Sequence, residues 1–342
     1  MSYIVPIGPY HPALEEPVHA RLNVEGEEIK SAEVFIGYNH RGIEKLAQQK
    51  NYIQTLVMVE RVCGICSHSH SFAMATEQIA QMEVPKRGQY LRVITAELER
   101  LHSHYLWLGI ALHIIGHDSL FMHTWDDREA IMDILEELTG NRVNYGMVTI
   151  GGARRDISAV TAKNINAMLD KIEASNNKLV EILLADKSVA LRTQGVGVLT
   201  TEDAIRIGAV GPQARASALA VDVRKDAPYI CYEDFDFNKV VYNTCDVFSR
   251  VVIRVLENVE SIKINGKEQI CAIPIISSRL LIPYFSITAG SDFTISLHAN
   301  GSVKFAAPTS TAVAPASIIS ITSSGLLTPP IPTTGILTAF AV

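Results

Sequence analysis

The sequence predicts a mainly α-helical protein of the α+β class, in which a small N-terminal β-sheet precedes a central helical bundle. Two observations predict it. Residues 1–40 hold short apolar runs separated by Gly and Pro, which is typical of strands. Over residues 41–268 apolar residues recur every three or four positions, which is typical of helices with one buried face. The 342 residues can bury a sizeable core, and we expect residues 1–268 to form one domain.

Each expected element follows from its own stretch of sequence. Strands are expected at 3–8 (YIVPIG), 19–26 (HARLNVEG) and 32–38 (AEVFIGY). Helices are expected at 41–62, 69–82, 87–116, 119–140, 156–187 and 246–264. Pro85 breaks the pattern after the second helix, Gly140 is suited to a C-cap, and either Asp156 or Ser158 can cap the next helix. The segment 141–156 between them is expected to be a loop with strand character.

Composition and charge exclude some classes of function. A net charge of −6 leaves no basic field for binding nucleic acid. The first residues, MSYIVPIGPYHPALEEP, lack the basic and long apolar regions of a signal peptide. Five cysteines would leave one over in any disulfide scheme, so we expect a reducing, intracellular setting. Because charges interrupt every apolar run up to residue 304, membrane association would have to come through partner proteins.

The last part of the chain, residues 269–342, differs abruptly in composition. Its only charged residues are Arg279, Asp292 and Lys304, and it is rich in Ser, Thr, Ala and Pro. It has neither helix periodicity nor the charge of a solvated disordered tail. Either this tail is a frame-shifted rendering, or it belongs to a divergent natural homologue. The abruptness of the change favours the first hypothesis.

The stretch RVCGICSHSH, residues 61–70, contains a C-x-x-C pair formed by Cys63 and Cys66. This spacing turns two sulfurs to one side of a tight turn, where they can bind one metal ion. A zinc ribbon would need a second such pair, which the sequence lacks. A thioredoxin-type pair would follow a strand, whereas this pair follows an expected helix. Spacing alone leaves a metal site and a redox or merely buried pair about equally favoured.

The surroundings of the pair resemble a known family. RVCGICSHSH fits R-x-C-G-x-C-x-x-x-H, the first cysteine motif of [NiFe]-hydrogenase large subunits. The resemblance continues in order through five further blocks: GPYHPALEEP, GYNHRGIEKL, ELERLHSHYLWLG, NRVNYGMVTIGGARRDI and GAVGPQARAS. A final block, DVFSRVVIRVLENVESIKI, extends it to about residue 268. The sequence thus resembles the large subunits of membrane-bound, energy-converting hydrogenases of the Ech or carbon-monoxide-linked type, and more distantly the 49-kDa subunit of complex I, which lacks these cysteines.

The resemblance implies a nickel–iron centre with cyanide and carbon monoxide on the iron. Cys63 would be a terminal nickel ligand, and Cys66 would bridge nickel and iron, metals that soft thiolates hold through redox changes. Glu16 matches the family's proton-relay glutamate, and Glu15 beside it is the competitor. Glu44 matches a glutamate that binds a second metal, magnesium or iron, in many relatives.

Two further residues of the motif receive roles by the same resemblance. Arg61 would place a positive charge beside the thiolates and lower their pKa. His70 would donate a hydrogen bond to a cysteine sulfur, the alternative being a plain helix-capping histidine. The family closes its site with a second pair, D-P-C-x-x-C, near the C-terminus, and this chain has no counterpart: its last cysteine is Cys271.

Other chemistry-bearing residues have plainer expected roles. His102 and His104 are expected to be core histidines, with a place in a proton path as the alternative. Glu97 is left open between a relay carboxylate and an ion pair, and Glu99 is expected to form an ordinary ion pair. Tight backbone turns are expected at 151–152 and 211–215, since no phosphate-loop pattern surrounds either. Small buried side chains are expected for Cys231 and Cys245. The arginines that could line the site or a subunit interface are Arg154, Arg155 and Arg215.

The resemblance implies a function and its partners. The chain would catalyse the interconversion of H2 with protons and electrons, and a partner small subunit with a [4Fe-4S] cluster would take the electrons. Membrane subunits would translocate ions, and ferredoxin or a carbon monoxide dehydrogenase relay would supply electrons at the cytoplasmic face of the membrane. The alternative is a metal-free relative of the complex I subunit with a structural, quinone-binding or NAD-binding role.

Overall fold

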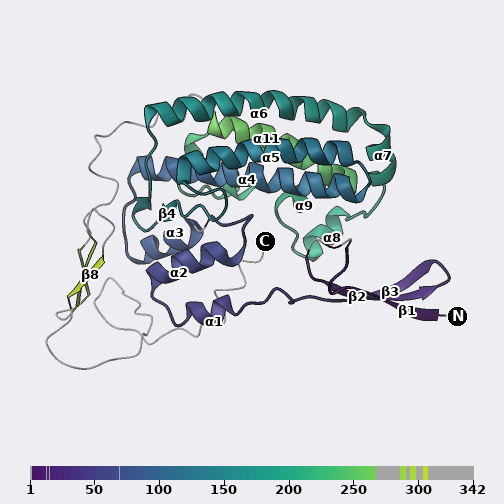
Figure 1. Cartoon of the computed structure of the whole chain (residues 1–342), viewed down its shortest axis with the longest axis horizontal. Coiled ribbons are helices and arrows are strands. Elements are labelled where there is room, and N and C mark those ends of the chain that lie inside the picture. Colours follow the sequence, from purple (N-terminus) through teal and green to yellow (C-terminus); the bar gives the residue numbers. More distant parts are fainter. Residues whose placement is uncertain are drawn as a thin grey trace. The chain divides into compact units, whose positions relative to one another are not determined.

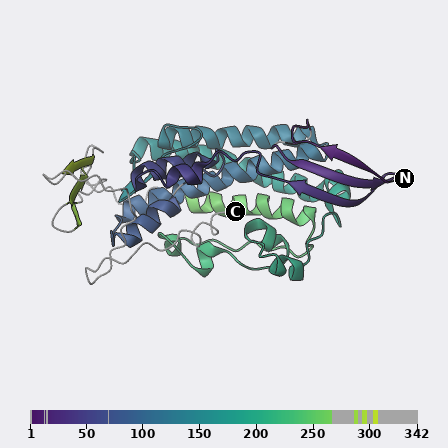
Figure 2. The same cartoon turned by 90° about the horizontal axis from the view of Figure 1, so that it is seen from below.

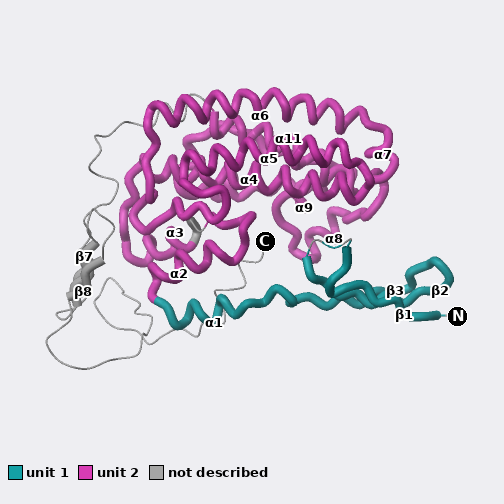
Figure 3. Tube along the Cα trace, in the orientation of Figure 1, with its two compact units in different colours: residues 1–50 teal, residues 51–342 magenta. Residues whose placement is uncertain are grey.

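The computed structural model describes residues 2–266 except Ala13, Glu15 and Ser69, with the backbone alone at residues 70 and 71. It also describes three short strands of the C-terminal part as one antiparallel sheet, namely β6 (Ser286–Ala289), β7 (Phe293–Leu297) and β8 (Val303–Ala306). The hypotheses about the rest of residues 269–342 lie outside the described residues. The chain divides into two compact units, Met1–Lys50 and Asn51–Val342 (Figure 3).

The first unit is a three-stranded antiparallel sheet followed by one short helix. Its elements are β1 (Ser2–Ile7), β2 (His19–Glu25), β3 (Glu28–Phe35) and α1 (Ile43–Ala47). The register pairs Val5 with Leu22 and Leu22 with Ala32, so apolar residues share one face of the sheet. All three expected strands are confirmed.

The second unit is a helical bundle. Its four long helices are α4 (Lys86–Ile114), α5 (Asp118–Thr139), α6 (Ala159–Ala185) and α11 (Val247–Asn265). They pack against one another side by side, as Figures 1 and 2 show from two directions. The predicted mainly α-helical bundle with a small N-terminal sheet is therefore confirmed. In the described part of the chain, no helix combines the length and the apolar character needed to span a bilayer.

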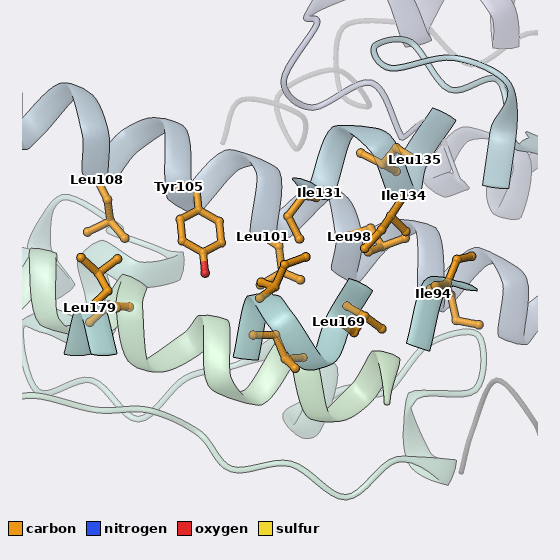
Figure 4. Packing of buried hydrophobic residues seen from close by; sticks show 14 of the residues in the cluster. Ile94, Leu98, Leu101, Tyr105, Leu108, Ile131, Ile134, Leu135, Leu169 and Leu179 are labelled. Carbon is orange, nitrogen blue, oxygen red and sulfur yellow. The ribbon is translucent and has the colours of Figure 1, made fainter. Parts of the chain in front are cut away.

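The core of the bundle follows directly from the apolar spacing of α4. Its buried leucines, at positions 91, 98, 101, 108 and 112, recur at intervals of three, four and seven, which keeps them on one face. They interlock with side chains of α5 and α6, among them Ile131 and Leu169 (Figure 4). Full burial of each such side chain stabilises the fold by roughly 1.5–3 kcal/mol, which explains why this helix is the centre of the unit.

Capping residues set the helix ends. The hydroxyl of Ser158 accepts the Thr161 N–H at 3.0 Å, so Ser158 rather than Asp156 begins α6. Gly140 ends α5 with a φ of 81°, a left-handed conformation that favours glycine, as predicted.

The expected continuous helix at 41–62 is wrong. It is broken between α1 and α2 (Tyr52–Val59), because Asn51 and Gln54 form a reciprocal capping box that starts a new helix. A 3₁₀ turn, η1 (Glu60–Val62), then leads into the cysteine loop, after which α3 (His70–Ile79) begins.

Between residues 141 and 246 the structure adds small elements. They are β4 (Val148–Thr149), β5 (Gly152–Ala153), α7 (Lys187–Thr193), α8 (Thr201–Arg206), α9 (Gly211–Ala216), α10 (Val223–Asp226) and the 3₁₀ turn η2 (Tyr232–Asp234). The turn expected at 151–152 is confirmed, since it joins β4 to β5. The turn expected at 211–215 is wrong: Pro212, in the first helical turn, starts the short helix α9 there.

Gly109 is required where α4 meets α5. A Cβ added to Gly109 would overlap with the indole ring of Trp125 and lie 2.8 Å from the hydroxyl of Thr124. We expect Gly109→Ala to lower the free energy of unfolding by about 1–3 kcal/mol, the usual cost of overpacking. Urea unfolding followed by circular dichroism measures this. Ser103→Ala, on the same helix as Gly109, is the control. Gly208→Ala is not suitable as a control, because Gly208 has a positive φ. An unchanged unfolding midpoint for Gly109→Ala would contradict the close packing.

Candidate metal centre

The C-x-x-C pair lies in the loop between η1 and α3, at the end of the second unit's first helical segment. Neither thiol is in a disulfide; Cys63 is half-buried and Cys66 is exposed. The two sulfurs are joined by a hydrogen bond, and the Ile65 N–H donates to the Cys63 Sγ at 3.4 Å. The loop therefore presents two neighbouring soft donors to one point, as the spacing predicted.

The ionisation of the pair differs from the expectation based on Arg61. The pKa of Cys66 is raised, first by its hydrogen bond to Cys63, then by burial and by the negative charges of Cys63 and Glu99. Arg61 donates from Nη1 to the backbone oxygen of Val57 at 2.9 Å and lies 3.8 Å from Glu60. The predicted lowering of the thiol pKa is therefore wrong for Cys66, because Cys66 keeps the proton that it shares with Cys63 and its loss would leave two negative sulfurs side by side.

A carboxylate on α4 reaches the same loop. The Oε2 atom of Glu99 accepts the backbone N–H of His68 at 2.6 Å, and the N–H of Ser67 also donates to this carboxylate. Burial, with smaller contributions from the charges of Cys63 and Glu60, raises the pKa of Glu99 to about 8. Among the described residues no cation lies within ion-pairing distance of Glu99. The expected ordinary ion pair at Glu99 is therefore wrong.

The raised pKa of Glu99 gives stability a definite pH dependence. The folded state keeps this proton up to about pH 8, whereas an unfolded glutamate loses it near its usual pKa of about 4.3. Stability is therefore greatest below that usual value and falls as pH rises towards 8. We expect Glu99→Gln to remove this slope, which is at most about 1.4 kcal/mol per pH unit. Urea unfolding at pH 5.5, 7 and 8.5 tests it, and the same slope in the variant as in the natural chain would contradict it.

Glu97, two residues before Glu99, has the opposite environment. It is fully buried and accepts hydrogen bonds from Arg224, Tyr232 and Ser261, the last at 2.7 Å. Burial would raise its pKa, but the charges of Arg100 and Arg224 outweigh burial and lower it. The question left open for Glu97 is thus answered by an ion pair with Arg224 of α10, and a hydrogen bond from Ser261 ties the same carboxylate to α11.

His102 and His104, on α4, are both buried, as expected. Burial and the charge of Arg128 lower the pKa of His102 to about 4, so its ring is neutral. The Arg128 Nη2 lies 2.8 Å from its Nε2, and the hydroxyl of Tyr145 lies 3.4 Å from its Nδ1. The ring also makes a hydrogen bond to the backbone of Ile65, between the two cysteines. His104 lies 3.5 Å from Glu257, away from this loop, and burial also lowers its pKa.

A second loop, residues 141–157, packs against the cysteine loop. The N–H of Gly146 donates to the buried carboxylate of Glu60, and a Cβ on Gly64 would lie 3.0 Å from Val143. The glycine turn of this loop is held by Glu77 and Arg92, whose side chains form a buried two-bond ion pair. The C-x-x-C loop is therefore packed between two elements and not a free surface loop.

The arginines considered for a site or interface separate in the structure. Arg215 is buried and pairs with Glu257 at 2.5 Å, so its role is structural. Arg154 and Arg155 are exposed, and the charge of Arg154 acts on Glu60 beside the cysteine loop.

The remaining cysteines differ from one another in burial. Cys231 is buried beside Tyr232 and Phe235, as expected. The burial expected for Cys245 is wrong, because Cys245 is partly exposed at a left-handed φ of 62°. Cys271 lies outside the described residues, as does the side chain of His70. In the described part of the chain no group of three or more His, Cys, Asp or Glu residues is placed to hold a metal ion.

The remaining predicted site residues lie in the first unit. Glu16 accepts a hydrogen bond from Asn39 and lines a depression of about 380 Å³ together with Tyr10 and His11. Glu44 is an exposed residue in the first turn of α1. Glu15 is outside the described residues. The roles of Glu16 and Glu44 remain predictions.

The residues present fit half of a nickel–iron donor set. Cys63 and Cys66 are reduced, adjacent in space and held in a packed loop, and thiolates are the soft ligands that nickel and low-spin iron prefer. The contact of Glu99 with the cysteine loop was not predicted from the sequence. The three-residue spacing of Glu99 and His102 could have indicated it, because it puts both side chains on one face of a helix.

Comparisons with known proteins agree with the resemblance that the sequence motifs indicated. A family model described as nickel-dependent hydrogenase matches residues 41–116, and one described as the 49 Kd subunit of respiratory-chain NADH dehydrogenase matches residues 115–273. The chain is 42% identical over 264 residues to the carbon monoxide-induced hydrogenase of Rhodospirillum rubrum, which covers 76% of this chain and 73% of that relative. It is 40% identical over 262 residues to the membrane-bound hydrogenase subunit alpha of Pyrococcus furiosus, covering 74% of this chain and 61% of that relative.

A solved structure is also similar. A chain of the membrane-bound sulfane sulfur reductase, an archaeal respiratory membrane complex, matches with a TM-score of 0.75 and 25% identity, covering 90% of this chain and 89% of that one. The two family models and the relatives together show what the sequence motifs indicated. The chain belongs to the family of oxidoreductase subunits that includes the large subunits of nickel-dependent, membrane-bound hydrogenases and the 49-kDa subunit of the respiratory-chain NADH dehydrogenase.

Proposed function

We propose that the chain is the catalytic large subunit of a multisubunit membrane-bound [NiFe]-hydrogenase, which interconverts H2 with protons and electrons. One observation carries the proposal: the reduced thiols of Cys63 and Cys66 lie side by side in a packed loop of a chain that is 42% identical to a hydrogenase. A 49-kDa subunit of complex I has no use for two converging thiols, whereas a nickel–iron centre requires them.

In this proposal the two cysteines hold the metals. Cys63 and Cys66 would hold the nickel and an iron that carries cyanide and carbon monoxide, and Glu44 would hold a second metal, magnesium or iron. When bound, the nickel–iron centre would supply the redox-active site at which H2 is split. The chain's own residues receive the proton: a cysteine thiolate would accept it first, and we propose Glu16 as the carboxylate that receives it next.

The partners follow from the same proposal. Electrons would pass to a [4Fe-4S] cluster in a partner small subunit, and ferredoxin or a carbon monoxide dehydrogenase relay would exchange them with it. Membrane subunits would use the reaction to translocate ions, with this chain attached peripherally at the cytoplasmic face of the membrane. The relatives named as membrane-bound hydrogenase and respiratory membrane complex support this arrangement.

Metal analysis of the purified complex tests the proposal. We expect close to one nickel per chain, together with H2 evolution from a reduced dye. A complex that evolves H2 but contains no nickel would overturn the assigned site. The same test also bears on residues 269–342. A nickel–iron centre takes four thiolates, and the described residues supply one neighbouring pair, Cys63 and Cys66.

Replacing Glu16 tests the proton route separately from metal binding. Glu16→Gln keeps the size and the hydrogen bond to Asn39 but cannot carry a proton. We expect nickel content to be unchanged and H2 evolution to fall by about 10²-fold or more, the usual worth of a positioned acid or base. Glu27→Gln, at the tip of the β2–β3 turn, is the matched control. If Glu16→Gln evolves H2 at the natural rate, this route is wrong.

A metal-free subunit like the 49-kDa protein of complex I is the second candidate, with a structural, quinone-linked or NAD-linked role. It is favoured by the family match over residues 115–273 and by the lack, among the described residues, of a complete metal-binding cluster. Its signature would be normal assembly and activity of the complex when Cys63 and Cys66 are both replaced by serine.

A further inference from the structure

We propose that Glu99 and His102, one turn apart on α4, are positioning residues that fix the C-x-x-C loop and so set the two sulfurs side by side before any metal arrives. The motif that brings metal ligands together is thus supported by a helix about 31 residues further along the chain. The proposal rests on the proposed function only in assigning the loop to a metal.

The contacts of Glu99 fall on the C-terminal side of the pair. Its carboxyl group accepts the backbone N–H groups of Ser67 and His68, which follow Cys66 directly. Because one side chain accepts both N–H groups, its loss would break two hydrogen bonds at once. The peptide that leaves Cys66 is therefore tied to α4.

The contact of His102 falls between the two cysteines, and its direction follows from its neighbours. Arg128 can only donate, so the His102 Nε2 beside it must be the acceptor. The ring proton is then on Nδ1, and the ring N–H donates to the backbone carbonyl of Ile65. Arg128 thus fixes the tautomer that His102 needs, and α5 takes part in holding the loop.

The two contacts act on one short peptide. Residues three apart on a helix lie on the same face, so the face of α4 that carries Glu99 and His102 meets the loop at two points on either side of Cys66. Two fixed points within four residues leave the loop little freedom to separate its sulfurs. Without these two contacts the loop would be mobile, and bringing the two sulfurs together would cost conformational entropy.

A dithiol-specific reagent measures this arrangement without nickel. Phenylarsine oxide binds two thiols at one arsenic with release of one water, and ring closure is fast only when the sulfurs are already neighbours. The test uses the full chain produced in nickel-depleted medium, with the Cys63→Ser variant as the baseline for the other cysteines. We expect His102→Leu and Glu99→Leu to slow ring closure by about 10-fold or more.

Matched variants separate positioning from folding. His102→Asn keeps a donor near the position of Nδ1, and Glu99→Gln keeps an acceptor oxygen, so we expect both to restore most of the natural rate. His113→Leu, an exposed α4 histidine that pairs with Asp118, should have no effect. Iodoacetamide, which needs one thiol, should react with Cys66 at least as fast in the leucine variants as in the natural chain.

The outcomes decide the proposal. Slower ring closure in the leucine variants with unchanged thermal unfolding, and rescue by the conservative variants, supports it. Leucine variants that close the ring at the natural rate overturn it. If His102→Leu does not fold, Glu99→Leu against Glu99→Gln gives the same decision. If the natural complex contains no nickel but the leucine variants still close the arsenic ring more slowly, the proposed function is refuted and this inference stands.

Discussion

Cys63→Ser should leave the purified complex without nickel and without H2 evolution, the largest effect expected of any single change in this chain. A serine hydroxyl keeps its proton at neutral pH and is a hard donor, so it cannot replace a thiolate on nickel. Changing an outer-shell partner of a metal costs 10–100-fold in affinity or activity, and loss of a ligand should exceed about 100-fold. Elemental analysis and an H2 electrode measure the two losses. Cys66→Ser should behave in the same way.

Cys245→Ser is the matched control for this prediction. Cys245 lies in the same unit, is partly exposed, and its sulfur donates to the backbone oxygen of Asn243 at 3.5 Å, so the change tests cysteine loss away from the loop. We expect normal nickel content and activity. A Cys63→Ser complex that retains both would instead favour the metal-free function, in which the pair is dispensable.

The long helices could be predicted because their determinants are local. The leucines of α4 recur on one face, and the ends of α5 and α6 are marked by Gly140 and Ser158. Short elements could not be predicted in the same way, since α8 and α9 have six residues each and show no full period. The break before α2 was visible in principle, because Asn51 and Gln54 have the spacing of a capping box.

Only the part of the candidate site that is contiguous in the sequence, the two cysteines, could be predicted. The C-x-x-C spacing identified the two thiols, but the roles of Glu97 and Glu99 depend on partners that are distant in sequence. Residues two apart on a helix point about 200° away from each other. Glu97 therefore faces Arg224 and Ser261, 127 and 164 residues away, while Glu99 faces the cysteine loop. Sequence alone shows that the two glutamates face opposite ways but not which one meets cations.

Glu97→Gln should produce the largest loss of stability, about 3–5 kcal/mol in the free energy of unfolding. The carboxylate is fully buried and compensates two guanidinium groups, Arg100 and Arg224, which bond to it at 3.2 and 3.0 Å. A glutamine keeps the shape but takes this carboxylate away from Arg100 and leaves Arg224 with Asp222 alone, and removing one partner from a buried ion pair is costly. Urea unfolding at pH 7 followed by circular dichroism gives the value.

Glu99→Gln is the matched control, because it makes the same chemical change two residues away on the same helix. Since the pKa of Glu99 is about 8, its carboxyl is mostly protonated at pH 7, and a glutamine imitates that form. We expect it to cost no stability at pH 7 and instead to raise it, because the natural glutamate gains free energy by ionising when the chain unfolds and a glutamine does not. The low pKa of Glu97 adds a second distinction: its contribution is present above the usual glutamate pKa and is lost as pH falls below it, so the difference between the two variants should narrow in acid. Equal losses for both variants at pH 7 would show that the arginines around Glu97 are compensated by other groups.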